Sequence, residues 1–574
     1  MNARLRVSIG QHSDKGRKPV NQDFYGAISP DEPDLSLKGA ALALADGVSS
    51  SEVSQIAAES AVKGFLTDYY CTSEAWSVKT SARRVIAASN SWLHAQNQRS
   101  FRTYEKDRGY VCTFSAMVLK GRQAHLFHIG DARIFRVSGA ALEQLTNDHR
   151  VILSSVESYL GRALGVNAQV EIDYRVEAIN PGDVFVLATD GVYEFVDSAF
   201  VTGAISSAAD LDAAARAIVE EALRRGSDDN LTIQIARVEQ VATGAADDAL
   251  QSTSDLPPAP LLEARSLFDG YRIVRQLHAS ARSHIYLAED IESGQVVALK
   301  TPSIDLRDDK AYLKRFMLEE WVARRVSSAY VLKPSPIARK RNFLYVAFEF
   351  VEGQTLAQWM LDHPRPELES VRAIVDQVAR GLTAFHRKEM IHQDLRPANV
   401  MIDRTGTARI IDFGSTRVAG VAETAQAAVN AEILGTVQYT APEYFLGQGG
   451  SARADVYSLG AIAYHMLTGR LPYGAQVSHI RTPAQARKLV YTPIADVSHD
   501  LPLWVDGALR KALHPDPEQR FAEPAEFAYA LRNPVIDSEP TRLIDRDPLK
   551  FWKMVSALLG AAVVALLFLL TMRR

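Results

Sequence analysis

Cysteine is scarce in this chain, because its 574 residues include only Cys71 and Cys112. Two cysteines so far apart exclude a disulfide framework and a cysteine-based zinc knuckle, and they favour a reducing compartment. An excess of positive charge is also missing, since 64 lysines and arginines face 68 acidic residues and leave a net charge of -4. No cationic field is present to hold nucleic acid, so we expect no nucleic-acid partner.

Long apolar runs are absent as well, with one exception near the C-terminus. The first ten residues show no apolar core or cleavage pattern, so the sequence predicts no signal peptide. Residues 554–572, in contrast, carry no charge, and a helix of that length would span roughly 28 Å, close to the ~30 Å core of a bilayer. Lys550, Lys553 and Trp552 precede the run and two arginines follow it. We expect a single membrane-spanning helix that acts as a tail anchor; a buried core helix is the alternative.

The composition predicts two globular halves. Hydrophobic residues make up 47% and charged residues 23% of the chain, which suits packed domains. Residues 242–267 and 533–549 are rich in proline and polar residues and are typical of linkers. Both halves alternate β-rich runs with helical periods, which predicts a multidomain α+β protein. The predicted segments are a domain over 1–240, a linker over 241–268, a domain over 269–533, a juxtamembrane linker over 534–553 and the spanning helix over 554–572.

Several aspartates of the first half stand at the ends of short apolar runs. Each Asp-Gly pair by itself is typical of a hairpin turn. Together they place carboxylates at the edge of a sheet, where like charges repel one another unless cations neutralise them. Oxygen ligands without paired His or Cys favour Mg²⁺ or Mn²⁺ over Zn²⁺. The aspartates concerned are Asp23, Asp46, Asp131, Asp190 and Asp229.

In their order along the chain, these acids and their neighbours resemble the metal-dependent protein phosphatases of type 2C. The motifs are Asn21-Gln22-Asp23, Ala45-Asp46-Gly47, Gly130-Asp131-Ala132-Arg133, Ala188-Thr189-Asp190-Gly191 and Asp229-Asn230-Leu231-Thr232. The resemblance implies two β-sheets sandwiched between helix layers, and hydrolysis of phosphoserine and phosphothreonine with a pair of Mn²⁺ or Mg²⁺ ions. The roles it implies are metal binding by Asp46, the Gly47 carbonyl, Asp190 and Asp229, orientation of bound water by Asp23, and a third metal at Asp131.

The first half departs from that family at three positions. Gln22 stands where the family usually has Glu, so one negative charge is lost. Lys18 replaces an arginine that clamps phosphate, and a lysine is a point charge instead of a bidentate fork. The adjacent Arg17 is the expected substitute, and Val48 replaces a His found in some relatives. We therefore expect phosphate binding by Lys18 and Arg17, and an active phosphatase with a higher metal requirement.

The second half carries groups suited to phosphoryl transfer. Lys300 ends a β-rich run, and nineteen residues later Glu319 lies on the apolar stripe of a predicted helix. A carboxylate on an apolar face needs a cation, so we expect Glu319 to pair with Lys300; a solvated helix face is the alternative. Farther along, Asp394 and Asn399 belong to His-Gln-Asp-Leu-Arg-Pro-Ala-Asn, and Asp412 opens Asp-Phe-Gly. Phosphoryl transfer requires mostly positioning and charge neutralisation, which these groups can supply.

With Ala441-Pro442-Glu443 and the later Asp455 and Arg520, this set resembles the Hanks-type Ser/Thr protein kinases, close to their bacterial branch, across about residues 269 to 533. The resemblance implies a bilobal fold that binds ATP with Mg²⁺. It implies that Lys300 holds the ATP phosphates, that Glu319 holds Lys300, and that Asp394 orients the substrate hydroxyl. The remaining implied roles are Mg²⁺ binding by Asn399 and Asp412, a lining of the nucleotide site by Leu277, Ile285 and Ala298, and structural contacts by Glu443, Arg520 and Asp455.

The glycine-rich phosphate loop of that kinase family is missing. Residues 278–283 are His-Ala-Ser-Ala-Arg-Ser, so no glycine lets the backbone approach a phosphate closely. Gln393 replaces the arginine that in many kinases pairs with a phosphorylated activation loop, while Arg396 keeps the positive charge of a family lysine. We expect a looser lid over the phosphates and no switching through the position of Gln393.

The sequence as a whole predicts a membrane-anchored bifunctional enzyme, a Ser/Thr protein kinase and a metal-dependent phosphoserine/phosphothreonine phosphatase on one chain. The main alternative is an active phosphatase whose weak kinase-like half serves as a nucleotide-binding regulatory or docking module; a scaffold inactive in both halves is a third. The expected cofactors are ATP, Mg²⁺ and Mn²⁺. The expected partners are phosphorylated and unphosphorylated proteins, the membrane, and the two halves of the chain for each other in cis. The expected location is the inner membrane, with both catalytic domains in the cytosol.

Overall fold

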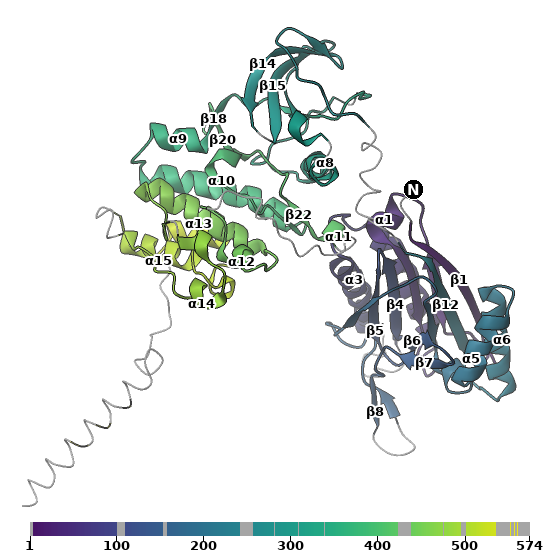
Figure 1. Ribbon diagram of the computed structural model, residues 1–574. Helices are drawn as coiled ribbons and strands as arrows, with labels where there is room; N and C mark the ends of the chain where they lie inside the picture. The colour runs from purple at the N-terminus through teal and green to yellow at the C-terminus, as the bar shows by residue number, and fades with distance from the viewer. Residues whose placement is uncertain are drawn as a thin grey trace, which may run out of the picture.

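The chain folds into two bodies that follow one another in sequence (Figure 1). Each body buries hydrophobic clusters of its own. The computed structural model describes residues 4–99, 109–152, 158–241, 256–280, 282–307, 309–337, 339–422, 438–474, 476–494 and 501–534, with residues 552, 556 and 560.

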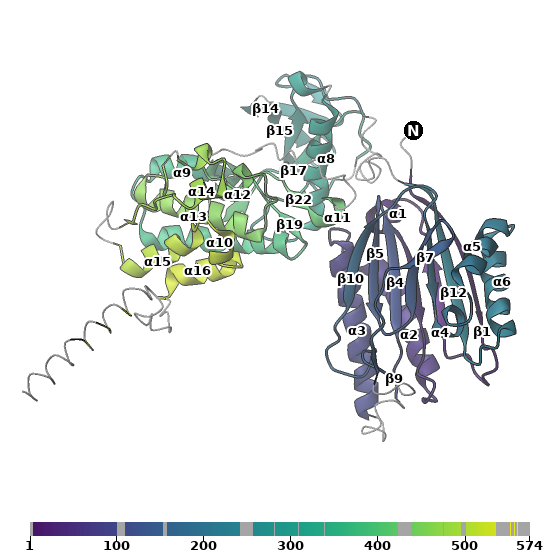
Figure 2. The same ribbon diagram turned by 60° about the horizontal axis from the view of Figure 1, so that its bottom comes forward.

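The N-terminal body is a pair of five-stranded sheets between two helix layers (Figure 2). Helices α2 (Ser54–Cys71) and α3 (Val78–Arg99) cover one sheet, and α5 (Ser198–Ser207) and α6 (Leu211–Arg224) cover the other. The first sheet has the order β1 (Arg6–Asp14), β12 (Leu231–Gln240), β11 (Val184–Ala188), β6 (Arg133–Ser138) and β7 (Ala141–Gln144). The second has the order β10 (Asp173–Ala178), β5 (Gln123–Ile129), β4 (Phe114–Lys120), β3 (Ala40–Ala45) and β2 (Phe24–Ile28). The other elements are α1 (Asp34–Lys38), α4 (Asp190–Tyr193), β8 (Arg150–Ile152) and β9 (Ser158–Leu160).

Strand β3 shows how the sequence produces these layers. Every residue of Ala40–Ala45 is buried. Leu42 and Leu44 face the opposite sheet, whereas the alanines between them face α2 and α3, because successive side chains of a strand point to opposite faces. The strand ends at Ala45, which places the carboxylate of the next residue, Asp46, at the edge of the sandwich.

The C-terminal body has two lobes (Figure 1). The smaller lobe packs α8 (Lys310–Arg325) beside a sheet of the order β13 (Leu267–Phe268), β14 (Tyr271–Ala279), β15 (Ser283–Asp290), β16 (Val296–Pro302) and β17 (Val346–Glu349). The helical lobe is built around α13 (Ala452–Thr468), which is buried over most of its length. The neighbouring helices are α9 (Leu356–Asp362), α10 (Leu368–His386), α11 (Ala419–Ala422), α12 (Pro442–Phe445), α14 (Pro483–Ala486), α15 (Leu503–Ala512) and α16 (Pro524–Arg532).

Short strands and single turns complete the helical lobe. The strands are β18 (Gly353–Thr355), β19 (Met390–Ile391), β20 (Val400–Asp403), β21 (Ala408–Ile410) and β22 (Arg417–Val418), and the 3₁₀ turns of the body are η2 (Ile304–Leu306), η3 (Pro397–Asn399), η4 (Gln476–His479) and η6 (Pro517–Gln519). Strand β19 pairs with β22, and β20 pairs with β21, so the loops that follow β19 and β21 lie side by side. Those two loops carry the Asp394 and Asp412 motifs.

Part of the segment expected to link the halves lies against the smaller lobe. The backbone N–H of Leu344 donates to the carbonyl of Pro257 at 2.8 Å. Ala259 is buried, and Leu262 packs on the cluster formed by that lobe. Residues 242–255 lie outside the described residues. The chain from Pro257 onward is therefore part of the C-terminal body.

The predicted membrane-spanning helix over residues 554–572 is wrong on the structural finding. Within the described part of the chain, no helix combines the length and the apolar character that a bilayer crossing requires. Of the apolar run itself, the structure describes only Ser556 and Gly560. The membrane partner and the inner-membrane location rested on this helix and are corrected with it.

Candidate active sites

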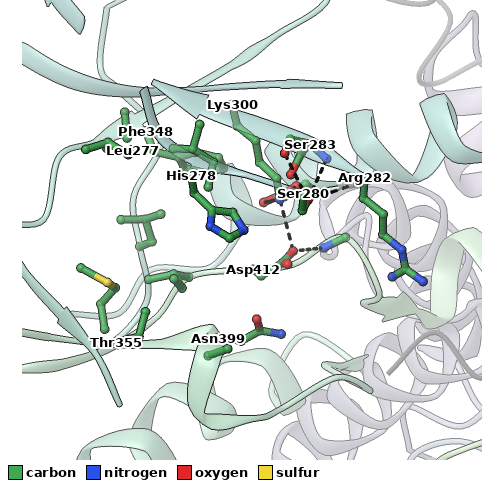
Figure 3. Close-up of a pocket in the computed structure, with 18 of the residues that line it drawn as sticks. Leu277, His278, Ser280, Arg282, Ser283, Lys300, Phe348, Thr355, Asn399 and Asp412 are labelled. Atoms are coloured by element: carbon green, nitrogen blue, oxygen red, sulfur yellow. Dashed lines mark hydrogen bonds and ion pairs between the residues drawn. The ribbon is translucent and has the colours of Figure 1, made fainter. Parts of the chain in front are cut away.

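A cavity of about 840 Å³ separates the two lobes of the C-terminal body (Figure 3). Leu277, Ile285 and Ala298, the expected nucleotide-site residues, line it from β14, β15 and β16. Phe348 and Val351 line it near the connection of the lobes, and the loops after β19 and β21 contribute polar groups from the other side. The polar residues lining the cavity include Lys300, Glu319, Asp394, Asn399 and Asp412.

Lys300 bridges two carboxylates from different elements of this cavity (Figure 3). Its Nζ lies 2.7 Å from Glu319 Oε2 on α8 and 3.4 Å from Asp412 Oδ1. Burial opposes the charge of the ammonium, but Asp412 and Glu319 raise the pKa of Lys300. Burial raises the pKa of Glu319 to about 7 against the opposing effect of Lys300. The pKa of Asp412 is lowered, because Lys300 and the Gly414 N–H outweigh its burial.

Asp455 of α13 holds the loop that carries Asp394 in place. Asp455 is almost fully buried and accepts hydrogen bonds from the backbone N–H of His392 at 2.9 Å and of Gln393 at 3.1 Å. Its Oδ2 also lies 2.8 Å from His386 Nε2. Gln393 has a φ of 68°, a conformation that costs a non-glycine residue energy. The two backbone bonds to Asp455 thus hold a strained residue directly before Asp394.

Other contacts fix the ends of the same loop and of the segment that follows it. Asn399 Nδ2 donates to the Asp394 carbonyl at 2.8 Å and to Asp394 Oδ2 at 3.2 Å. Farther along, Arg520 forms a bidentate pair with Glu443, with both N···O distances 2.8 Å and both side chains buried. The guanidinium also donates to the His514 carbonyl at 2.7 Å, which satisfies a further donor.

The glycine-free loop between β14 and β15 is closed by a serine. Ser280 N donates to the Ser283 carbonyl at 3.0 Å, while Ser280 Oγ accepts from the N–H groups of Ser283 at 3.1 Å and Arg282 at 3.3 Å (Figure 3). The N–H groups of Arg282 and Ser283 therefore point toward the Ser280 hydroxyl instead of toward the cavity. Arg282 lines the cavity and provides a cation above it. The sequence analysis did not single out Arg282.

The five aspartates of the first half gather at one edge of the sandwich and perturb one another. Burial raises the pKa of Asp23 to about 6, against the opposing effect of its hydrogen bonds, and burial together with the charges of Asp131 and Asp229 raises the pKa of Asp190 to about 7. Asp46 is partly buried, and burial followed by the charge of Asp23 raises its pKa. Gly47 leaves no room for a side chain, since a Cβ would lie 2.8 Å from the Gln22 carbonyl. The cluster has the chemistry of a cation site.

Basic side chains engage this cluster. Arg150 Nε lies 2.6 Å from Asp131 Oδ2, and its Nη2 lies 2.8 Å from Asp190 Oδ2. Lys18 Nζ lies 3.3 Å from Asp229. No group of three or more His, Cys, Asp or Glu side chains in the described ranges is arranged around a metal position as it stands. Asp23 Oδ1 is nonetheless buried without a hydrogen-bond partner in the structure, which fits a cation ligand or an ordered water.

Gln22, which departs from the phosphatase family, and Arg17, the expected substitute for its arginine, have defined surroundings. Gln22 Nε2 donates to the Ser51 carbonyl at 2.6 Å and to Ser54 Oγ at 2.7 Å, so its amide binds the start of α2. Arg17 is exposed on the loop after β1. Arg150 was missed by the sequence analysis; the available signal was the excess of aspartates, which demands a cation nearby.

Two family models match the chain, one in each body. Residues 11–236 match the model described as protein phosphatase 2C, and residues 271–534 match the model described as protein kinase domain. The fold and the two sites thus define a phosphatase–kinase fusion. The chain belongs to the type 2C phosphatase family through its N-terminal body and to the Hanks-type Ser/Thr protein kinase family through its C-terminal body.

Known proteins match one body at a time. Serine/threonine-protein kinase PknA of Corynebacterium glutamicum is 29% identical over 272 residues, or 46% of this chain and 55% of the relative. The PknI kinase domain of Mycobacterium tuberculosis is 29% identical, covers 48% of this chain and 99% of its own, and has a TM-score of 0.37. The catalytic domain of the phosphatase PstP, solved with two manganese ions, is 24% identical, covers 41% and 99%, and has a TM-score of 0.34. The chain spans about half the length of the curated relatives it matches.

Proposed function

We propose that this chain is a bifunctional signalling enzyme that phosphorylates serine and threonine in proteins with one body and dephosphorylates them with the other. The observation that carries the kinase half is the position of Lys300, which contacts both Glu319 and Asp412 beside a cavity large enough for a nucleotide. The observation that carries the phosphatase half is the cluster of aspartates at one edge of the sandwich, where burial and neighbouring carboxylates raise the pKa values of Asp46 and Asp190, and Asp23 is buried with a raised pKa. Phosphorylated and unphosphorylated proteins are the proposed substrates.

In the kinase half, each proposed role follows from a contact in the cavity. Lys300, held by Glu319, is the cation that pairs with ATP phosphates. Asp394 accepts the proton of the substrate hydroxyl, and the Asn399 amide keeps the Asp394 side chain in place. Asn399 and Asp412 are the proposed Mg²⁺ ligands, since both provide oxygens at the inner end of the cavity.

In the phosphatase half, the proposed metal ligands are Asp46, the Gly47 carbonyl, Asp190 and Asp229, with Asp23 and Asp131 close by. Bound Mg²⁺ or Mn²⁺ would supply an activated water and neutralise charge at phosphorus. Asp23, which accepts a hydrogen bond from Thr189 Oγ1 at 3.0 Å, is fixed so that its other oxygen can orient that water. Lys18 and Arg17 are the proposed phosphate-binding cations, and Lys18 already lies at the edge of the cluster.

A second candidate function is favoured by one specific observation. Ser280 turns the N–H groups of the phosphate loop toward its own hydroxyl, which leaves fewer donors for ATP. If this loss is decisive, the kinase body binds nucleotide weakly and acts as a regulatory or docking module.

Transfer of radiolabelled phosphate from ATP by the full chain separates the two candidates. The assay uses Asp46→Asn, so that label is not removed, and compares it with Asp46→Asn combined with Asp394→Asn. Label that appears on the chain or on a generic protein substrate and disappears with Asp394→Asn supports the bifunctional enzyme. Nucleotide binding without any transfer supports the module.

A further inference from the structure

The two bodies contact each other through a loop of the phosphatase body that connects α2 with α3. We call this loop, residues 72–77, together with the first three residues of α3, 78–80, the docking loop. In both views its neighbour α3 lies beside α11 of the kinase body (Figures 1 and 2). The Gly420 N–H donates to the Ala75 carbonyl at 3.0 Å, and Trp76 Nε1 donates to the Arg387 carbonyl at 3.0 Å. The docking loop therefore reaches two separate segments of the kinase body.

Charged side chains extend this contact. Glu389 accepts hydrogen bonds from the Ser77 N–H at 2.7 Å and from Thr80 Oγ1 at 2.6 Å. Glu74 of the docking loop forms an ion pair with Arg325, the last residue of α8. Each of these bonds joins residues more than 200 positions apart in the sequence.

The buried parts of this interface fit one another closely. Ala75 has no exposed surface and belongs to the hydrophobic cluster of the kinase body. Lys120, at the end of β4, is 1% exposed and donates to the Gly420 carbonyl at 2.6 Å. A Cβ on Gly420 would lie 2.6 Å from the Glu74 carbonyl, so only glycine fits there. Burying a lysine is unfavourable unless its ammonium is hydrogen-bonded, which makes this geometry specific instead of incidental.

The docking loop is itself held in shape by the phosphatase body. Lys38, at the end of α1, is buried and donates to Thr72 Oγ1 at 2.7 Å and to the Ser73 carbonyl at 2.8 Å. The Arg84 guanidinium lies 4.3 Å from the Trp76 ring centre. These contacts within the phosphatase body hold the docking loop in one conformation, which lowers the entropy lost when it binds the kinase body.

The three kinase segments that it touches each carry one acid of the active site. Arg325 lies six residues after Glu319 on α8, about 9 Å along the helix. Glu389 directly precedes β19, which leads to Asp394, and Gly420 follows β22, which comes after Asp412. Strand pairing between β19 and β22 joins the last two segments. The docking loop therefore contacts all three of these segments at once, and the relative position of these segments brings Lys300 to its two carboxylates.

We infer that the phosphatase body is an intramolecular activator of the kinase body: the docking loop, by binding α8, the approach to the catalytic loop and α11 together, stabilises the arrangement in which Lys300 contacts Glu319 and Asp412. This inference rests on the proposed kinase activity. It assigns to the phosphatase body a role independent of its own catalysis.

The docking surface leaves the aspartate cluster open. Lys120 and Gly39 lie at one end of the β3–β4 pair, whereas Asp46 and Thr113 lie at the other. From Gly39 to Asp46 the chain advances seven residues, roughly 24 Å at ~3.4 Å per residue. The phosphatase site and the docking loop can therefore be altered separately.

The test disrupts the docking loop with Glu74→Ala combined with Trp76→Ala. Both changes are made in the full chain that carries Asp46→Asn, so that transferred phosphate is not removed. The matched control is Glu59→Ala combined with Trp92→Ala, which removes an exposed Glu and an exposed Trp from α2 and α3. The rate of phosphate transfer from ATP should fall about tenfold in the docking variant, within the 5–150-fold range usual for coupled sites, and less than twofold in the control. Hydrogen exchange should become faster in α8 and in residues 417–422 of the docking variant only.

A charge exchange provides a second readout. Glu74→Arg should lower the transfer rate, and Arg325→Glu added to it should restore the rate, because the ion pair is rebuilt with opposite polarity. The inference is overturned if the docking variant matches the control in both transfer and exchange, if it transfers faster, or if the exchanged pair gives no rescue. If the unaltered chain transfers no phosphate, the proposed function fails instead, and the hydrogen-exchange comparison still decides whether the docking loop stabilises α8.

Discussion

Replacing Asp455 by asparagine tests whether α13 positions the catalytic loop of the kinase body. The carboxylate of Asp455 accepts three hydrogen bonds, from the His392 N–H, the Gln393 N–H and His386. Burial opposes its charge, but the hydrogen bonds and charges of His386 and His392 together lower its pKa, so it is ionised at neutral pH. Asparagine has nearly the same shape, but its NH₂ group takes the place of Oδ2 and cannot accept the hydrogen bonds from His392 and His386.

The magnitude follows from the bonds that are lost. The two bonds on Oδ2, from His392 and His386, disappear, whereas Oδ1 can still accept from Gln393. A hydrogen bond to a charged group contributes about 1.5–3 kcal/mol, so the loss of two should cost the kinase body about 3–6 kcal/mol of stability. For a domain of this size that corresponds to a decrease in Tm of about 6–24 °C. Displacement of Asp394 by about 1 Å should lower kcat about 100-fold.

Thermal unfolding and ATP titrations of phosphate transfer measure these effects. The KM for ATP should change less than threefold, because Lys300 and its two carboxylates do not contact Asp455. The matched control is Asp506→Asn, which removes a carboxylate that accepts from the Ile494 N–H at 2.8 Å and the Tyr491 hydroxyl at 2.9 Å. This control should lower Tm and leave kcat within twofold. A wild-type kcat for Asp455→Asn would refute the positioning role.

Three further outcomes are expected. The pKa values of Asp23 and Asp190 are raised, to about 6 and about 7, so the metal-free phosphatase body binds more protons when folded than when unfolded. Its stability should therefore fall as pH rises from 4 through 7. Added Mn²⁺ should raise Tm more at pH 8 than at pH 5, and an equal increase in Tm at both pH values would contradict this reasoning. Arg150→Ala should tighten Mn²⁺ binding severalfold by calorimetry, since Arg150 competes for Asp131 and Asp190; weaker binding would show that Arg150 assists the metal. Ser280→Gly should lower the KM for ATP about two- to fivefold by releasing N–H donors, a change that an unaltered or higher KM would exclude.

The sequence predicted the parts of the sites that depend on local pattern. The helical stripe placed Glu319 on a buried face, and the structure sets it 2.7 Å from Lys300. The short apolar runs placed Asp46 and Asp190 at strand ends, and the layered sheets bring them together. These residues follow from periodicity, because the period of a helix or strand decides which side chains face inward.

Other features depend on contacts between distant segments and could not be predicted. The bonds from the catalytic loop to Asp455 join residues 62 and 63 positions apart. The contact of Lys120 with Gly420 spans 300 positions and requires both bodies to be folded first. The membrane helix was predicted from the apolar run of residues 554–572 and the charged and aromatic residues beside it, and no helix of the described residues is long and apolar enough to cross a membrane.

If the bonds between the docking loop and Gly420 affect the kinase site, then binding at the kinase site must affect docking in return. If docking favours the arrangement in which Lys300 contacts Glu319 and Asp412, then a nucleotide that binds this arrangement must strengthen docking by the same factor. Occupancy of the cleft between the kinase lobes would then be transmitted to the docking loop of the neighbouring sandwich. ATP concentration would thereby set how firmly the two catalytic bodies hold together.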